Sequence, residues 1–131
     1  QYMNFYIYTD ASYRNKIACG AIVIDCNSSL IKREIYFKCA NSTEAEIYTL
    51  YKGICIAKEI LVEWPQAKIF VHNDEQRLVD YFAGACRPPK GISKYKFTIN
   101  TSKSIYLRWI KREQNYLADN LCADGMSQYS Y

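Results

Sequence analysis

The sequence predicts a mixed α/β fold in which a five-stranded sheet is flanked by helices. Three strand patterns joined by tight turns open the chain, which is typical of an antiparallel meander. Helical and strand patterns then alternate, which favours the addition of two parallel strands. Half of the 131 residues are hydrophobic and 23% are charged, so the chain can bury a core. We therefore expect a single domain over residues 1–131.

The first three strands follow one another closely. Residues 3–9 form an aromatic and β-branched run and predict a strand that ends at Asp10. Residues 16–26 predict the second strand, residues 27–29 a turn, and residues 30–39 the third strand. Because the connections are short, these strands are expected to pair antiparallel.

A long helix is predicted next, at residues 43–62, where apolar side chains recur at helical spacing. Ser42 or Thr43 is expected to cap its start, and the Trp-Pro pair at 64–65 ends it. Gly53 lowers helix propensity, so we expect it to allow a close approach between helix and sheet.

The rest of the chain alternates short strands and helices. The predicted elements are a strand at 68–73 that ends at Asp74, helices at 75–83 and 92–101, a strand at 104–110 and a helix at 114–126. The last helix has an apolar face that includes Tyr116 and Cys122. The tail at 127–131 is expected to fray.

Charge is distributed unevenly along the chain. The formal net charge is +4, and residues 81–112 contain several Lys and Arg residues but no Asp or Glu. A stretch of one sign can contact a phosphate backbone, and it can equally be a solvated, lysine-rich surface. We take it as a candidate nucleic-acid contact that includes Lys94 and Lys96.

The cysteines and the hydrophobic runs indicate in which cellular compartment the protein is expected. None of the six cysteines belongs to a CxxC pair, and most lie in apolar runs, where a free thiol behaves as a small hydrophobic group. No signal-peptide pattern is visible, and the apolar runs fall well short of the ~20 residues that span a bilayer. We therefore expect reduced thiols, a cytoplasmic location, no membrane partner and a monomeric protein.

Four acidic residues lie where their side chains can gather at one end of the sheet. Asp10 and Asp74 each follow a predicted strand, and open α/β sheets bind ligands at the carboxyl ends of strands. Glu46 shares the inward face of its helix with Gly53, and Asp119 lies on the last helix. Carboxylates that converge repel one another unless cations neutralise them, and oxygen ligands favour Mg²⁺ or Mn²⁺. The pattern therefore predicts a metal site suited to two-metal phosphodiester hydrolysis.

Short segments around these acids resemble a known family. The segments YTDAS, AEIYTL followed by KGI, VHNDEQRLV and WIKREQNYLADNL are similar, in this order, to the successive signatures of type 1 ribonuclease H. The resemblance runs from residue 5 to about residue 124, and its last segment resembles the compact, plant-like and archaeal-like branch. It implies a ribonuclease H-like fold. It also implies cleavage of the RNA strand of an RNA–DNA hybrid with two Mg²⁺ or Mn²⁺ ions, leaving a 5′-phosphate.

The resemblance also implies roles for individual residues. Asp10 would bridge both ions, Glu46 and Asp74 would complete the ion nearer the leaving group, and Asp119 would complete the ion that activates water. Contacts to the 2′-hydroxyls of RNA would come from small polar residues at or beside the family's positions. These candidates are Ser12, Ser42, Thr43, Gln76 and Asn115. The same residue types also serve as helix caps.

The chain lacks a histidine that many type 1 enzymes have before the last helix. Those enzymes carry a mobile histidine in the loop before the last helix, where this chain has KREQN. Its one histidine, His72, is in a predicted strand, where we expect it to be packed or hydrogen-bonded rather than catalytic. Glu113 could take over part of the missing role. The segment before the last strand is also too short for the long basic extension with which some bacterial enzymes bind hybrids.

Other functions are compatible with parts of the pattern. A DNA junction resolvase or a toxin nuclease of the same superfold would also use acids and Mg²⁺. A non-catalytic nucleic-acid-binding domain would not require four negative charges clustered beside a phosphate backbone. A proofreading-type exonuclease would have D-x-E on the first strand, where this chain has Asp10-Ala11-Ser12. A flavodoxin-like domain would not begin with three antiparallel strands.

Overall fold

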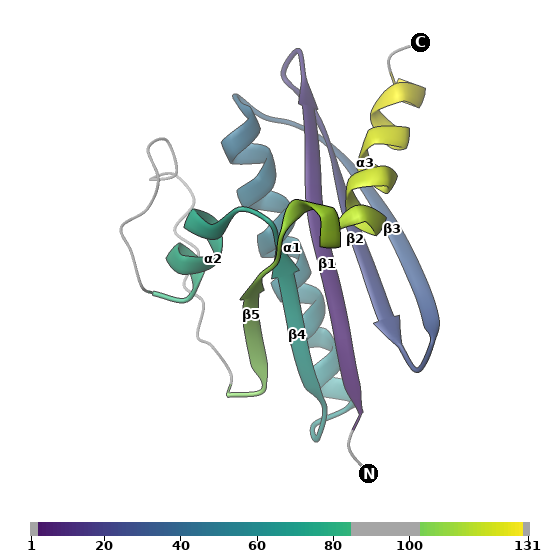
Figure 1. Cartoon of the computed structure of the whole chain (residues 1–131), viewed down its shortest axis with the longest axis vertical. Coiled ribbons are helices and arrows are strands. Elements are labelled where there is room, and N and C mark those ends of the chain that lie inside the picture. Colours follow the sequence, from purple (N-terminus) through teal and green to yellow (C-terminus); the bar gives the residue numbers. More distant parts are fainter. Residues whose placement is uncertain (1–2, 85–102, 130–131) are drawn as a thin grey trace.

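The computed structural model describes residues 3–84 and 103–129. Within these residues the chain forms five strands, three α-helices and one 3-10 helix (Figure 1). In chain order they are β1 (Asn4–Arg14), β2 (Ile17–Cys26), β3 (Ser29–Lys38), α1 (Ser42–Glu63), β4 (Lys68–Asn73), α2 (Gln76–Phe82), β5 (Ile105–Trp109), η1 (Arg112–Gln114) and α3 (Tyr116–Tyr129). This is the predicted order of strands and helices. The predicted helix at 92–101 lies outside the described residues.

The strands form one mixed sheet in the order β3-β2-β1-β4-β5. β1, β2 and β3 make an antiparallel meander, whereas β4 pairs parallel with β1 and β5 pairs parallel with β4. Both hairpins turn through two residues with positive φ, Asn15–Lys16 and Asn27–Ser28, a geometry that matches the twist of paired strands. The predicted sheet of three antiparallel strands with two parallel additions is confirmed.

The end of β1 differs from the prediction in a way that matters for the site. The strand does not end at Asp10 but continues to Arg14, because β2 stays paired with it along this length. The parallel neighbour stops earlier, since the last pair between β1 and β4 is Tyr8 with His72. Asp10 therefore lies inside a strand and yet just beyond the carboxyl end of β4.

Helix α1 packs on one face of the sheet. The main core lies between them and includes Ile7, Ile69 and Val71 from the strands and Leu50 and Ile54 from the helix, each at most 1% exposed. The predicted close approach at Gly53 is also present, because a Cβ atom on this residue would lie 2.8 Å from Thr9 Cγ2. Helix α1 is thus held directly against the part of β1 that carries the site.

The start of α1 corrects a prediction. The residue before the helix is Asn41, in an extended conformation, and its Oδ1 accepts a hydrogen bond from the Glu44 amide at 2.8 Å. We expected Ser42 or Thr43 in this position, but both are inside the helix. Asn is as good a cap as Ser or Thr, so residue preference alone could not choose among three neighbouring candidates.

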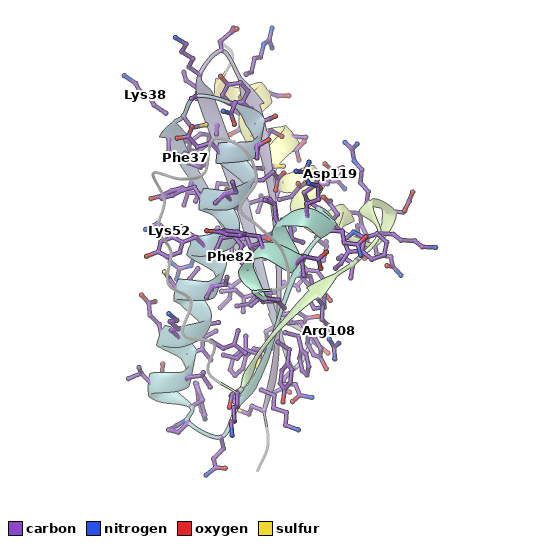
Figure 2. All side chains as sticks on the ribbon, turned by 90° about the vertical axis from the view of Figure 1, so that its left-hand side faces the viewer. Phe37, Lys38, Lys52, Phe82, Arg108 and Asp119 are labelled. Carbon is purple, nitrogen blue, oxygen red and sulfur yellow. The ribbon has the colours of Figure 1, made fainter. Side chains whose placement is uncertain are left out.

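Helix α3 covers the other face of the sheet, over β1 and β2, so that α1 and α3 lie on opposite sides (Figures 1 and 2). Its buried residues Ala118 and Cys122 pack in one cluster with Cys19, Ala21 and Val23 of β2. This second, smaller core fixes the helix that carries Asp119.

The bounds of α3 also differ from the prediction. The 3-10 turn at Arg112–Gln114 delays its start to Tyr116, and the helix extends to Tyr129 instead of fraying from residue 127. Tyr116 is 57% exposed rather than part of the apolar face. It lies two residues, about 200° around a helix, from the buried Ala118, and so points away from the sheet. None of the helices in the described ranges is long and apolar enough to cross a membrane.

Candidate active site

A pocket of about 490 Å³ lies beyond the carboxyl end of β4. The four predicted acids all line it, although they come from four parts of the fold: Asp10 from β1, Glu46 from α1, Asp74 from the residue after β4, and Asp119 from α3. The other lining residues are Ala11, Ser12, Ser42, Thr43, Glu75, Arg77, Leu78 and Arg112. The fold therefore brings carboxylates that are distant in sequence to one place.

Asp10 is the most buried of the four acids, with 6% of its surface exposed. Its pKa is raised to about 6, first by burial, and further by the negative charge of Asp74 and a hydrogen bond with Asp119. Hydrogen bonds with Glu46 and with the Ala11 amide act in the opposite direction without cancelling the rise. Negative charge at Asp10 is thus only partly compensated by its neighbours.

Glu46 is held by donors from two strands. The Ala11 amide donates to Oε1 at 3.0 Å, and the side-chain amide of Asn73 donates to Oε2 at 3.3 Å. Burial raises the pKa of Glu46 well above its ordinary value, and the charge of Asp10 and a hydrogen bond with it add to the rise. A bound cation would remove the cost of ionising these two neighbouring carboxyls.

Asn73 is a site residue that sequence reasoning missed. It is fully buried at the end of β4, and besides Glu46 its Nδ2 donates to Thr9 Oγ1 at 3.1 Å. Its Oδ1 accepts a hydrogen bond from the Glu75 amide at 2.8 Å. Asn73 thus joins β1, α1 and the turn after β4. The available signal was a polar residue at the end of a strand with an apolar centre, directly before Asp74.

Asn115 supports Asp74 from beneath the pocket. Its Nδ2 donates to Asp74 Oδ2 at 3.1 Å and to the Thr9 carbonyl at 2.9 Å. The Trp109 indole donates to the Asp74 carbonyl at 3.0 Å, which fixes the backbone at the same point. We predicted Asn115 as a substrate contact, but the residue is only 1% exposed and does not line the pocket. Its place in this structure is that of a positioning residue.

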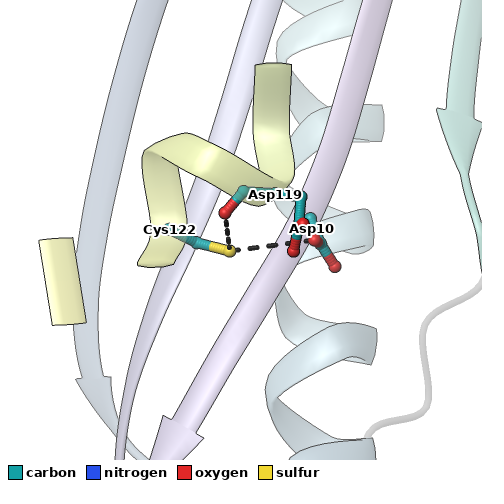
Figure 3. A group of neighbouring side chains, drawn as sticks. All are labelled: Asp10, Asp119 and Cys122. Carbon is teal, nitrogen blue, oxygen red and sulfur yellow. Dashed lines mark hydrogen bonds between the residues drawn. The ribbon is translucent and has the colours of Figure 1, made fainter. Parts of the chain in front are cut away.

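Asp119 lies in the first turn of α3, and Cys122 lies one turn further along the helix (Figure 3). The Cys122 thiol is 3.3 Å from the Asp119 carbonyl oxygen and 3.8 Å from Asp10 Oδ2. The Ser12 hydroxyl donates to the sulfur at 3.2 Å. In the sequence Cys122 was only one residue of an apolar helix face, and no motif there signals that its thiol faces a carboxylate.

The predicted substrate contacts are only partly at the pocket. Ser12, Ser42 and Thr43 line it, so their hydroxyls are available to a bound molecule. Gln76 is exposed at the start of α2 but is not a lining residue.

Positive charge reaches the pocket from two arginines: Arg112 ends the basic stretch at 81–112 that was predicted as a nucleic-acid contact, whereas Arg77 was not predicted. Arg77 of α2 and Arg112 of η1 line it, on the side of the molecule where the acids converge. The predicted lysine contacts, Lys94 and Lys96, lie outside the described residues.

His72 is a packed strand residue, as expected. It is buried, its Nδ1 lies 3.0 Å from the Ile7 carbonyl, to which it must donate, and its ring stacks on Tyr8 with centroids 4.6 Å apart. Burial lowers the pKa of His72. Glu113 lies exposed on η1 and is not a lining residue of the pocket.

The carboxylate set fits hard divalent cations. Its ligand atoms are oxygens, which Mg²⁺ and Mn²⁺ prefer. Asp10 lines the same pocket as Glu46, Asp74 and Asp119, and its pKa responds to all three, so it lies close to each of them. Burial, and the charge of a neighbouring acid, raise the pKa values of Asp10 and Glu46, so a bound cation would favour the ionised form of both.

Comparison with known proteins identifies the fold. No family model and no curated protein matches the chain. The structure of LC11-RNase H1, isolated from compost by a metagenomic approach, is similar with a TM-score of 0.83 and 19% identity over 98% of this chain and 99% of that one. LC11-RNase H1 in complex with an RNA/DNA hybrid gives a TM-score of 0.80 at 19% identity, over 97% of this chain and 99% of that one.

A third structure, RNase H1 from the halophilic archaeon Halobacterium salinarum, is similar with a TM-score of 0.67 and 15% identity over 98% of this chain and 99% of that one. These likenesses confirm the predicted ribonuclease H fold. At such identities they show the fold alone.

Proposed function

We propose that the protein is a metal-dependent endoribonuclease that cleaves the RNA strand of RNA–DNA hybrids by two-metal hydrolysis. The observation that carries this proposal is the convergence of Asp10, Glu46, Asp74 and Asp119 around one pocket. The fold supports it, because one structure with this fold is an RNase H1 in complex with an RNA/DNA hybrid.

The four acids would divide two ions between them. Asp10 would contact both, Glu46 and Asp74 would complete one, and Asp119 would complete the other. When bound, Mg²⁺ or Mn²⁺ lowers the pKa of an attacking water and stabilises charge on the leaving oxygen. The hydrolysis adds water across the P–O3′ bond of the RNA strand and leaves a 5′-phosphate and a 3′-hydroxyl.

Two buried amides hold the acids in place before substrate binds. Asn73 orients Glu46, and Asn115 orients Asp74, each through a hydrogen bond to a carboxylate oxygen. Outer groups of this kind fix the direction of a metal ligand and raise its affinity for the ion. Both amides also bond to Thr9, so the two acids share one support on β1.

The pocket rim suits an RNA strand. The hydroxyls of Ser12, Ser42 and Thr43 can pair with 2′-hydroxyl groups, which distinguish RNA from DNA. Arg77 and Arg112 can pair with phosphate oxygens on either side of the scissile bond.

The test is cleavage of four labelled substrates: an RNA–DNA hybrid, single-stranded RNA, duplex RNA and duplex DNA, each with Mg²⁺ and with a chelator. We expect internal cuts in the RNA strand of the hybrid, only with metal. Cleavage of duplex DNA but not of the hybrid would favour a junction resolvase or toxin nuclease. Binding of the hybrid without any cleavage would favour a non-catalytic binding domain.

A matched pair of variants on α3 makes the test specific. Asp119→Asn should lower hybrid cleavage by at least about a hundredfold, because even outer-shell groups contribute 10–100-fold at metal sites. Asp124→Asn makes the same chemical change on the same helix at an exposed position that does not line the pocket. Asp124→Asn should cleave the hybrid as fast as the wild type. An equal loss of cleavage in both variants would contradict the assignment of Asp119 as a metal ligand.

A further inference from the structure

One sulfur lies within reach of the candidate metal site. Cys122 is fully buried, and its Sγ lies 3.8 Å from Asp10 Oδ2. The ligand atoms of Asp10, Asp119 and Cys122 all lie within 4.8 Å of one another (Figure 3). A carboxylate site for Mg²⁺ or Mn²⁺ has no use for sulfur, which is a poor ligand for hard ions. The thiol would therefore allow the site to bind a class of metal ion that the hydrolytic reaction does not need.

We propose that Asp10, Asp119 and Cys122 form a site for a thiophilic divalent ion of the Zn²⁺ class, whose binding excludes the hydrolytic ions and inhibits the protein. This inference rests on the proposed function, because two of its three ligands are the acids that would hold Mg²⁺ or Mn²⁺.

The spacing fits one ion shared by sulfur and carboxylate. A tetrahedral Zn²⁺ binds sulfur at about 2.3 Å and carboxylate oxygen at about 2.1 Å, which places the two ligand atoms about 3.6 Å apart. The Sγ–Oδ2 distance in the structure is 3.8 Å, so an ion could be bound with little movement. Asp119 supplies a third ligand atom within the same cluster. Three protein ligands with one open position are a common arrangement for zinc.

The surroundings of the sulfur act in two directions. Burial and the charges of nearby carboxylates raise the pKa of Cys122, a hydrogen bond from Ser12 lowers it, and a bound cation would offset the rise. The Ser12 hydroxyl donates to Sγ at 3.2 Å, which supports negative charge on sulfur when the ion displaces the thiol proton to solvent. Cys122 and Asp119 are three residues apart on one helix, so a small rotamer change is enough to bring both to the same ion.

Competition follows from the shared ligands. Asp10 cannot serve the hydrolytic pair while it holds a Zn²⁺-class ion together with Cys122 and Asp119. Mixed oxygen and sulfur sites bind Zn²⁺ far more tightly than Mg²⁺, because sulfur is a soft ligand. A low concentration of zinc should therefore oppose a much larger concentration of magnesium.

The direct readout is the ultraviolet absorption of a thiolate bound to Cd²⁺, which requires no cleavage assay. Titration of the full chain with Cd²⁺ should give a band that is lost in Cys122→Ala and Cys122→Ser. Cys39→Ala, at a buried cysteine that packs with Ala18 and Ala45 and does not belong to the Asp10–Asp119–Cys122 group, should keep it. Asp10→Asn retains every thiol and should raise the Cd²⁺ concentration at half-saturation at least about tenfold. Bands of equal size in the wild type and both Cys122 variants would overturn the proposal.

A second readout separates this inference from the proposed function. If the hybrid is cut with Mg²⁺, Cys122→Ala should need at least about ten times more Zn²⁺ than Cys39→Ala to halve its own activity. Equal inhibition of the two variants, with Mg²⁺-dependent cleavage intact, would overturn the zinc site alone. If no hybrid is cut at all, the proposed function fails. A cadmium band that depends on Cys122 and is weakened by Asp10→Asn would still support the three-ligand site.

Discussion

Single residues decide how the pocket responds to pH. Burial raises the pKa of Asp10 from its ordinary value of 3.8 to about 6. At pH values between these two, the folded protein therefore holds a proton on Asp10 that the unfolded chain has lost. This contribution to stability is present at low pH and disappears as the pH rises through about 6. Without metal, the free energy of unfolding should therefore fall by roughly 2 kcal/mol on this account between about pH 4 and pH 7.

The variant Asp10→Asn isolates that contribution. It should abolish hybrid cleavage, keep the fold, and be more stable than the wild type at neutral pH without metal, because one charge leaves a repelling cluster. Urea unfolding of both proteins in the presence of a chelator, at a series of pH values, measures the difference. A wild-type protein that gains stability relative to Asp10→Asn as the pH rises would contradict the raised pKa.

Asn73 is expected to matter for activity although it does not line the pocket. Asn73→Ala removes a donor to Glu46 and leaves the Glu75 amide without its acceptor, which should cost about 1–3 kcal/mol of stability. Cleavage should fall about 10–100-fold because Glu46 loses its orientation. Denaturant unfolding and hybrid cleavage test both expectations, with the exposed Asn4→Ala as control. Full activity in Asn73→Ala would show that Glu46 needs no such support.

The acids could be predicted from sequence, but their supports could not. Asp10, Glu46, Asp74 and Asp119 belong to ordered segments with characteristic neighbours, so residue type and order were sufficient. The contacts of Asn73 to Glu46 and of Cys122 to Asp10 join residues 27 and 112 positions apart, and only the packing of α1 and α3 against the sheet creates them. A buried Cys on a helix face has no signature of its own, and a polar residue before Asp74 indicates the end of a strand but not which carboxylate it contacts.

At the scale of elements, the packing of α1 against β1 sets the position of Glu46. Gly53→Ala improves helix propensity by about 1 kcal/mol. The added Cβ would, however, meet Thr9 Cγ2 at 2.8 Å. Thr9 cannot turn away freely, because its hydroxyl donates to the His72 carbonyl at 2.8 Å. We expect a net loss of about 1–2 kcal/mol and weaker hybrid cleavage.

Urea unfolding and hybrid cleavage of Gly53→Ala test this expectation. Lys58→Ala, at an exposed position of the same helix, should change stability by no more than about 0.5 kcal/mol. A stabilised and fully active Gly53→Ala would mean that helix and sheet can separate without cost to the site.

The elements themselves were largely predictable, whereas their ends were not. Hydrophobic periodicity identified most of the described strands and helices because they have one or both faces in a core. β3 has no buried residue, and it was identified from its β-type residues after a tight turn. The ends depend on partners: β1 passes Asp10 because β2 continues to pair with it, and α1 begins after Asn41 because that side chain reaches the Glu44 amide. The length of the pairing with β2 is not visible to a local pattern, and at the start of α1 three neighbouring residues are all good caps.

At the scale of the whole molecule, substrate affinity should depend on the acid-free stretch at 81–112. Replacing Lys94, Lys96 and Lys103 by Ala should weaken hybrid binding and flatten the plot of log affinity against log salt concentration. The slope should change by up to about 0.9 for each phosphate group that the variant no longer neutralises. The measurement is hybrid affinity at several salt concentrations in an Asp10→Asn background, which prevents cleavage.

A control with the same reduction in positive charge replaces the exposed residues Lys32, Lys38 and Lys58. It should leave the slope close to that of the parent protein. An unchanged slope in the first triple variant would mean that those lysines face away from the hybrid.

The claim that the four carboxylates bind two metal ions is tested most directly with crystals of the protein grown with Mn²⁺. The anomalous scattering of manganese identifies each ion. Two ions should be bound, with Asp10 as a ligand of both, Glu46 and Asp74 on one, and Asp119 on the other. A pocket without manganese at saturating concentration, or ions held only elsewhere on the surface, would contradict a metal-dependent nuclease.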